Sequence, residues 1–269
     1  MDLHLRFYDF CNKKRIVEER IEGFELYAGL ISALNEFSKL LGFKLELLKF
    51  KDINLEREQI DKSRIRVINP YHSVEIPFGS DVIFSCENER FLNICALQAK
   101  MNIIYDLIIK NKIPLGPEKK ISRVEEEFIQ KILDNYHAKE NLNKSIQNLE
   151  IKINELVSEY KIYGLIGISI LSFDACILKV YNFDEQTLLE LLRDVGKLPE
   201  LEPYSWEVDI AKYKNKKYFL YLINSGIGIK VEKIFMPYYY LLICDIDSYL
   251  GEIPQIIYKE LNFILDQNI

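Results

Sequence analysis

The chain has 269 residues, of which 49% are hydrophobic and 28% are charged. This composition excludes wholesale disorder, and the length favours two domains over one. The formal net charge of −6 argues against binding to nucleic-acid backbones, which requires a positive surface. No apolar run approaches the roughly 18 residues of a bilayer-spanning helix, so we expect no membrane span.

The targeting and redox features predict a cytoplasmic protein. Residues 1–6 lack the basic stretch and the apolar core of a signal peptide. The five cysteines are odd in number and none forms a C-x-x-C pair, so we expect neither a disulfide framework nor a zinc knuckle. We expect no metal and no cofactor.

The first half of the chain mixes strands and helices. Apolar residues at helical spacing predict one helix from Phe24 to Leu41 and another from Glu87 to Asn111. Alternating apolar and polar residues predict the strands, which are residues 3–10, 44–51, 64–69 and 81–86.

A linker and a long helix follow. Pro114, Gly116 and Pro117 break helices and mark the linker. Ser122 and Glu125 form a capping box, in which each side chain accepts a hydrogen bond from the other residue's backbone N–H. We therefore expect helical structure from Ser122 to about Lys161.

One stripe of this helix is apolar at an a/d spacing of 4, 3, 4, 3 and 4 residues. Its members are Leu142, Ile146, Leu149, Ile153, Leu156 and Tyr160. Such a seam either joins two copies of a chain or packs a helix on its own sheet. We favour packing within the chain, because the seam is shorter than a typical coiled coil, and we keep it as a candidate partner interface.

The second half is richer in strands. Alternation predicts them at residues 164–172, 176–181, 206–213, 218–224, 228–233 and 238–246. Asp184 is expected to cap a helix that ends at Gly196, and the last helix is expected at residues 253–265. Gly226 and Gly228 are expected to form a turn.

Each half therefore fits an antiparallel sheet of about five strands with helices on its faces. We predict an α+β chain of two α/β/α layered domains joined by a long helix. The predicted bounds are 1–112 for the first domain, 113–140 for the linker and the start of the long helix, and 141–269 for the second domain.

Two segments of the second half carry a family resemblance. Residues 163–174 read Tyr-Gly-Leu-Ile-Gly-Ile-Ser-Ile-Leu-Ser-Phe-Asp, and residues 241–245 read Leu-Leu-Ile-Cys-Asp before Leu250, Gly251 and an amphipathic helix. In these segments the second half resembles the roadblock family. The chain departs from the family at Ala175, where the family usually has a glycine.

The first half resembles longin-like domains in residues 23–37 and in the strand-to-helix step at residues 81–97. Proteins that look like this are mostly dimerising platforms. The resemblance implies a partner that is a small Ras-like GTPase, a second copy or a related roadblock or longin chain as dimer partner, and archaeal relatives. It also implies activator or exchange-factor roles toward the GTPase, or an anchoring role in a larger assembly.

The sequence shows no reaction of its own. It has no P-loop motif, and His4, His72 and His137 are isolated. Asp245 and Asp247 could pair for acid–base work or hold a cation, although a polar strand end is the simpler interpretation.

An activating role on a GTPase would require an arginine that acts in trans. Four arginines lie in loops or at strand ends, and nothing singles one out; they are Arg15, Arg20, Arg57 and Arg64.

Two surface candidates remain. Tyr238 and Tyr240 belong to an aromatic run, and a position in the protein core and a position in a partner interface are equally favoured for them. Residues 212–217 contain four lysines around Asn215, and a solvated hairpin tip is favoured there over a docking site for an acidic partner.

The leading hypothesis is a non-enzymatic, dimerising platform that binds or regulates a small GTPase. The alternatives are a small-molecule sensor, a structural subunit of a trafficking or signalling complex, and a metal-dependent enzyme built on Asp245 and Asp247.

Overall fold

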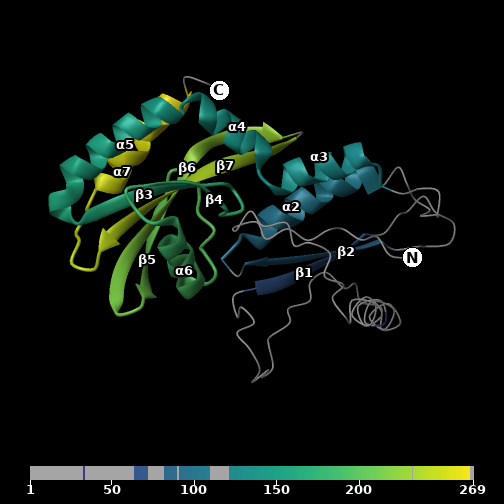
Figure 1. Cartoon of the computed structure of the whole chain (residues 1–269), viewed down its shortest axis with the longest axis horizontal. Coiled ribbons are helices and arrows are strands. Elements are labelled where there is room, and N and C mark those ends of the chain that lie inside the picture. Colours follow the sequence, from purple (N-terminus) through teal and green to yellow (C-terminus); the bar gives the residue numbers. More distant parts are fainter. Residues whose placement is uncertain are drawn as a thin grey trace. The chain divides into compact units, whose positions relative to one another are not determined.

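The computed structural model describes residues 33, 64–71, 82–89, 91–109, 121–231 and 233–266. The chain divides into two compact units (Figure 1). Unit 1 comprises Met1–Glu89 and Met101–Glu125, and unit 2 comprises Arg90–Lys100 and Glu126–Ile269. Helix α2 (Ile94–Ile104) therefore begins in unit 2 and ends in unit 1. The domain boundaries given above stay a prediction.

The described part of unit 1 contains a two-stranded antiparallel sheet. Strand β1 (Arg64–Tyr71) pairs with β2 (Val82–Glu89), as the alternation predicts for residues 64–69 and 81–86. The helix expected from Glu87 begins only at Ile94, because residues 87–89 continue the pairing with β1. A π-helical turn, Tyr105–Ile109, follows α2.

Of the helix predicted at residues 24–41, Ala33 is described and is helical. The strands predicted at residues 3–10 and 44–51 lie outside the described residues.

Unit 2 is built on one five-stranded antiparallel sheet with the order β4-β3-β7-β6-β5. Its strands are β3 (Leu165–Leu171), β4 (Ile177–Tyr181), β5 (Trp206–Tyr213), β6 (Lys216–Val231) and β7 (Ile234–Asp245). The inner strands β3 and β7 are almost continuously apolar, since helices cover both of their faces. The chain is thus a mixed α/β protein; a second five-stranded sheet in the first half stays a prediction.

Helices cover both faces of this sheet (Figure 1). They are α4 (Tyr136–Lys144), α5 (Ile146–Tyr160), α6 (Glu185–Val195) and α7 (Ile253–Asp266). Helix α3 (Arg123–Leu133) precedes them in the chain. Helices α5 and α7 lie side by side on one face, while α6 lies on the opposite face against β5. Asp184 caps α6 as predicted, because its Oδ2 accepts a hydrogen bond from the Thr187 N–H at 2.7 Å.

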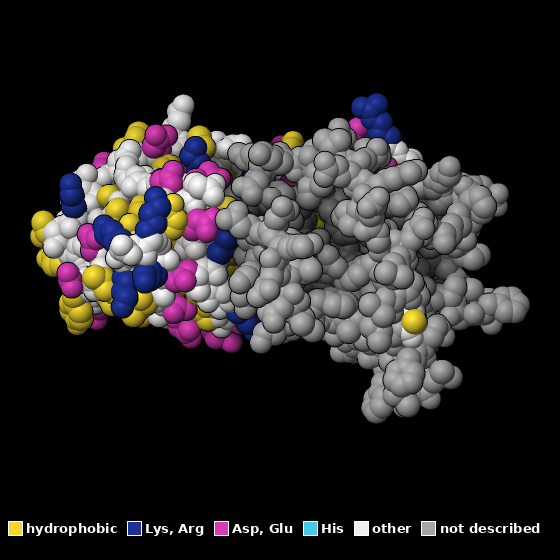
Figure 2. Space-filling model, turned by 60° about the horizontal axis from the view of Figure 1, so that its bottom comes forward, with side chains coloured by type: hydrophobic (Ala, Val, Ile, Leu, Met, Phe, Trp, Pro, Cys, Tyr) yellow, Lys and Arg dark blue, Asp and Glu magenta, His cyan; other side chains and the backbone are white. Residues whose placement is uncertain are grey.

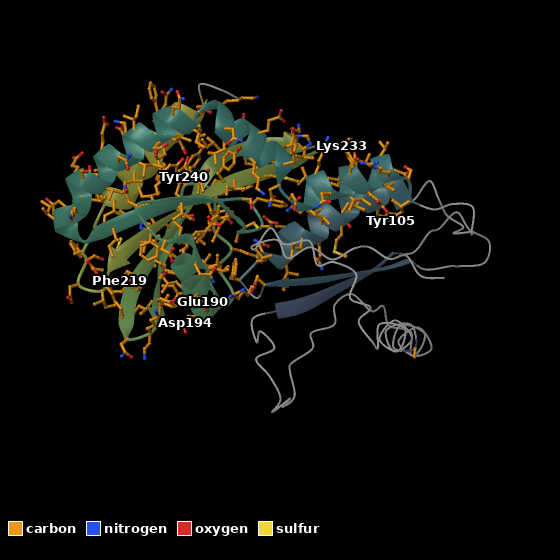
Figure 3. All side chains as sticks on the ribbon, in the orientation of Figure 1. Tyr105, Glu190, Asp194, Phe219, Lys233 and Tyr240 are labelled. Atoms are coloured by element: carbon orange, nitrogen blue, oxygen red, sulfur yellow. The ribbon has the colours of Figure 1, made fainter. Side chains whose placement is uncertain are left out.

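The main core of unit 2 lies between α5, α7 and the sheet. The inward stripe of α5 contains Leu149, Ile153 and Leu156, which belong to one buried cluster with alternate residues of β7. Tyr240 is one of these β7 residues and is fully buried (Figure 3). The a/d spacing of α5 therefore serves packing within the chain, which is the favoured alternative of the sequence analysis.

The helical segment between the linker and β3 is three helices rather than one. The capping box is present at its start, where Glu125 Oε2 accepts a hydrogen bond from the Ser122 N–H at 2.7 Å. Asn135 has a φ of 56° and separates α3 from α4. Ser145 separates α4 from α5. An asparagine tolerates this left-handed conformation, which cannot continue an α-helix.

The strands predicted at 218–224 and 228–233 are one strand, β6, that is interrupted by a bulge between Asn224 and Gly228. The turn expected at Gly226 and Gly228 is therefore wrong. Gly226 has a φ of 71° and faces the ring of Tyr204, and a Cβ on Gly228 would lie 2.1 Å from the Met236 carbonyl oxygen. Both positions need glycine because the backbone packs closely there.

Strand β5 forms one edge of the sheet. Two backbone N–H groups on its outer side donate hydrogen bonds to aspartate side chains. The Lys212 N–H donates to Asp194 Oδ2 of α6 at 2.7 Å, and the Ile210 N–H donates to Asp209 Oδ1 at 3.0 Å. Asp194 extends from α6 at this side of unit 2 (Figure 3). Val208 and Ile210 on this edge strand are about half exposed.

Within the described residues, no helix has the length and apolar character needed to cross a membrane.

Candidate functional site

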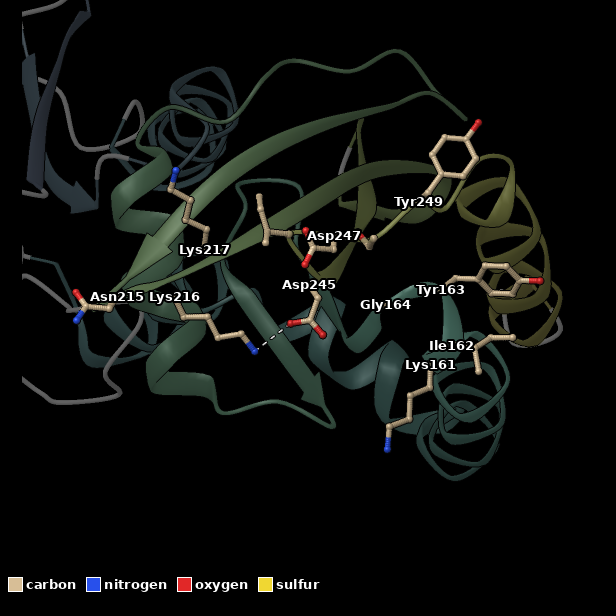
Figure 4. Close-up of a pocket in the computed structure, with 12 residues that line it drawn as sticks. Lys161, Ile162, Tyr163, Gly164, Asn215, Lys216, Lys217, Asp245, Asp247 and Tyr249 are labelled. Atoms are coloured by element: carbon tan, nitrogen blue, oxygen red, sulfur yellow. Dashed lines mark ion pairs between the residues drawn. The ribbon is translucent and has the colours of Figure 1, made fainter.

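Three loops meet at one end of the sheet in unit 2. Strands β3 and β6 begin at this end and β7 finishes there, since Leu165 pairs with Cys244 and Tyr218 pairs with Asp245. The loops, residues 161–164, 215–217 and 245–249, line an open hollow of about 850 Å³ (Figure 4). We refer to it as the sheet-end hollow.

Gly164 fixes the shape of the sheet-end hollow. It has a φ of 93°, and a Cβ at this position would lie 2.5 Å from the Cβ of Ser248. Its carbonyl oxygen accepts a hydrogen bond from the Asp245 N–H at 2.9 Å. The loop before β3 and the loop after β7 are therefore held together through the backbone, and only glycine permits so close an approach.

Lysines outnumber acids in the hollow, with three lysines and two aspartates among the lining residues. Lys216 Nζ lies 3.0 Å from Asp245 Oδ1 (Figure 4). The hydrogen bond to Asp245 raises the pKa of Lys216. Lys161 and Lys217 form no ion pair with a described residue.

Large apolar side chains surround these charges. Ile162 and Tyr249 are each 83% exposed, and Tyr163 is 48% exposed. The Tyr163 ring contacts the Tyr160 ring at a centroid distance of 6.3 Å. Apolar groups gathered at an exposed site are typical of a surface that a binding partner covers.

Asp245 and Asp247, considered above as a metal or acid–base site, lie in different elements: Asp245 ends β7 and Asp247 lies in the turn after it. β7 ends at Asp245, so strand alternation no longer relates it to Asp247, which is exposed in the turn that follows. Lys216 pairs with the Asp245 carboxylate. No three His, Cys, Asp or Glu side chains gather as metal ligands in the described part of the chain.

A second cluster of polar groups is buried in unit 2. Lys100 Nζ lies 2.5 Å from Asp174 Oδ2 and donates to the Leu133 carbonyl oxygen at 3.1 Å. Asn135 Nδ2 donates to Asp174 Oδ1 at 3.1 Å, and Ser172 Oγ also donates to Asp174 Oδ1. Burial acts to raise the pKa of Asp174, but Lys100 and these hydrogen bonds hold that pKa below its usual range.

The buried cluster joins three segments of unit 2. Asp174 lies in the turn between β3 and β4, and its carbonyl oxygen accepts a hydrogen bond from the Asn93 N–H at 3.1 Å. Ala175 in the same turn has a φ of 68°, a conformation that glycine adopts more readily than other residues. Because the cluster is closed to solvent, we assign it to folding rather than to chemistry.

The structure places the candidate interface residues in the core of unit 2. Four of them pack on the sheet through α4 and α5, and each is at most 4% exposed; they are Leu142, Leu149, Ile153 and Leu156. Ile146 is partly buried at the start of α5. A partner contact through these residues stays a prediction.

Tyr238 and Tyr240 belong to the same core. The Tyr238 hydroxyl donates to the Ala138 carbonyl oxygen at 3.2 Å, and burial raises its pKa. The Tyr240 hydroxyl donates to Asn262 Oδ1 at 2.8 Å. Both tyrosines therefore satisfy their polar ends within unit 2, in the way that a core position requires.

Other residues of interest were partly predictable. The lysine-rich segment 212–217 forms the tip of the hairpin between β5 and β6, and its four lysines are exposed, as favoured; Lys216 and Lys217 also line the sheet-end hollow. The signal for Ile162, Tyr163 and Tyr249 was weak, since single apolar residues in loops are common. Of the four arginines considered, Arg64 begins β1, whereas Arg15, Arg20 and Arg57 lie outside the described residues.

Comparison with known proteins gives no match: no protein-family model, no curated protein and no solved structure is similar to this chain.

Proposed function

We propose that the chain is a non-enzymatic interaction platform that binds a small Ras-like GTPase. The observation that carries this proposal is the exposed combination of apolar and lysine side chains around the sheet-end hollow. A protein partner would remove these apolar groups from water. The choice of a GTPase rests on the resemblance to the roadblock and longin-like families.

The element order of unit 2 supports the same proposal. Residues 146–266 run helix, two strands, helix, three strands, helix. This is the order expected for the second half from its sequence pattern, except that two of the four strands expected before the last helix are one strand, β6. The proposal does not depend on a partner contact through the seam of α5, whose residues pack in the core of unit 2.

The sensor alternative has weaker support. A small-molecule site encloses most of its ligand and is mainly apolar. The sheet-end hollow is open to solvent and carries charged side chains from all three loops.

The test is capture of a GTPase by the full-length protein. The immobilised chain is incubated with host lysate that contains either GDP or a non-hydrolysable GTP analogue, and the bound proteins are identified by mass spectrometry. We expect enrichment of a small GTPase in one nucleotide state, followed by direct binding of that purified GTPase. Equal recovery on beads carrying an unrelated acidic protein, or no GTPase in either state, would overturn the proposal.

A further inference from the structure

We propose that the sheet-end hollow is a docking surface for an acidic segment of a partner protein that carries a bulky apolar side chain. This inference rests on the proposed function, because it takes the chain to be an interaction platform. It adds the place of docking and the chemistry of the docked segment.

The charge of the hollow contrasts with that of the whole protein. The chain has a net charge of −6, yet the tip of the β5–β6 hairpin has four lysines and no acid between residues 212 and 217, and two of them, Lys216 and Lys217, line the hollow. Lys161 adds a further positive charge from the loop before β3. An acidic partner segment would therefore be attracted to this end of unit 2, and repelled by much of the remaining surface.

The apolar side chains specify the second feature of the partner. Tyr249 and Ile162 line the same hollow as the lysines, on two of its loops, and both are largely exposed. Figure 2 likewise shows lysine and hydrophobic side chains next to one another on one face of unit 2. A bulky apolar side chain of the partner would bury against these residues, while its acidic neighbours pair with the lysines.

The aspartates of the hollow favour a protein over a lipid surface or a nucleic acid. Asp245 and Asp247 lie among the lysines and would repel a dense array of phosphates. A peptide can place its acids beside Lys161 and Lys217 and avoid the two aspartates. The backbone hydrogen bond between Asp245 and Gly164, and the close approach of Gly164 to Ser248, would hold these groups in place before docking.

The experiment titrates the full-length chain into a fluorescent, glutamate-rich peptide with one central phenylalanine and follows the anisotropy. We expect binding that weakens with added salt. Combined Lys161→Glu and Lys217→Glu substitutions should weaken binding about tenfold, since each exposed attraction becomes a repulsion. Tyr249→Ala should weaken it about fivefold, as should replacement of the peptide phenylalanine by alanine.

Matched controls use exposed residues of unit 2 away from the hollow. Combined Lys144→Glu and Lys259→Glu substitutions change the net charge equally, and Phe263→Ala removes an aromatic ring that is 69% exposed. We expect each control to bind within about twofold of the unchanged protein. Equal losses in the controls and in the hollow variants would overturn the inference, because they would indicate a general charge effect.

A second probe separates the source of the negative charge. Vesicles of phosphatidylserine and phosphatidylcholine that bind the chain through Lys161 and Lys217, with no binding of the peptide, would overturn the inference in favour of a lipid surface. The peptide titration tests the docking surface, whereas nucleotide-dependent capture tests the GTPase proposal. Either result can therefore fail without the other.

Discussion

Two lysine–aspartate pairs in the described part of unit 2 differ chiefly in their exposure to water. The Lys100 and Asp174 side chains are each 1% exposed, and further hydrogen bonds surround their carboxylate. Those of Lys216 and Asp245 are 58% and 50% exposed. Removal of one member of a buried pair leaves an uncompensated charge, whereas an exposed pair exchanges readily with water. The first pair therefore holds the fold together, and the second remains available to a partner.

The largest effect is expected from Lys100→Met. It should lower the free energy of unfolding by about 3–5 kcal/mol, because Asp174 would keep a buried charge without its partner. Urea unfolding followed by the fluorescence of Trp206, the only tryptophan, measures this change in unit 2.

Asp174→Asn added to Lys100→Met provides the control for this prediction. It removes the buried charge and should recover part of the lost stability. A loss below about 1 kcal/mol for Lys100→Met alone would remove the distinction between the two pairs.

The next effect concerns the backbone that frames the exposed pair. Gly164→Ala should lower the free energy of unfolding by about 3 kcal/mol, since it adds both an unfavourable φ and a Cβ 2.5 Å from Ser248. Gly251→Ala is the control: its φ is also positive, at 52°, but the nearest atom to its Cβ would be 3.7 Å away. We expect a cost of about 1 kcal/mol there. Equal costs in urea unfolding would show that the contact with Ser248 is unimportant.

The pH dependence of stability should distinguish the buried pair. The pKa of Asp174 is lowered by folding, so its contribution is present above the unfolded pKa of about 3.9 and is lost as the pH falls through the folded pKa. In Lys100→Met, burial without the lysine should raise that pKa instead, and stability should fall as the pH rises from about 4.

Urea unfolding at a series of pH values provides the measurement. Each unit of difference in pKa changes the free energy by about 1.4 kcal/mol, so the two curves should diverge between pH 4 and 7. If the free energy of unfolding changed with pH in the same way in the unchanged protein and in Lys100→Met, the pH dependence could not be assigned to Asp174.

The smallest effect is expected from Lys216→Met. Because both members of this pair are largely exposed, its loss should change the free energy of unfolding by about 0.5 kcal/mol or less. Thermal unfolding at low and high salt provides the measurement. A change as large as that of Lys100→Met would refute the comparison between the pairs.

Much of the fold of unit 2 follows from local sequence. β5 coincides with its predicted residues, and β3, α6 and α7 lie within one residue of theirs, because alternation and capping act over a few residues. The errors arise where a distant pairing decides the outcome. Residues 87–89 become strand through β1, and β6 continues through Gly226 because β7 lies beside it.

The sites were less predictable than the elements. The sheet-end hollow joins residues 161–164 with 215–217 and 245–249, and only the order of the strands brings these loops together. Lys100 and Asp174 are likewise 74 residues apart. No spacing rule relates such positions, whereas the a/d seam was visible because its members from Ile146 to Tyr160 share helix α5.

The acidic side chains on the outer edge of β5 have a consequence for aggregation. Open strand edges nucleate fibrils and strand-exchanged oligomers, because free N–H and C=O groups capture another chain. On β5, Asp194 and Asp209 already accept hydrogen bonds from two of these N–H groups. An incoming strand would have to displace both carboxylates and meet their negative charge. The protein can thus expose Val208 and Ile210 at this margin while the backbone beside them resists growth of the sheet.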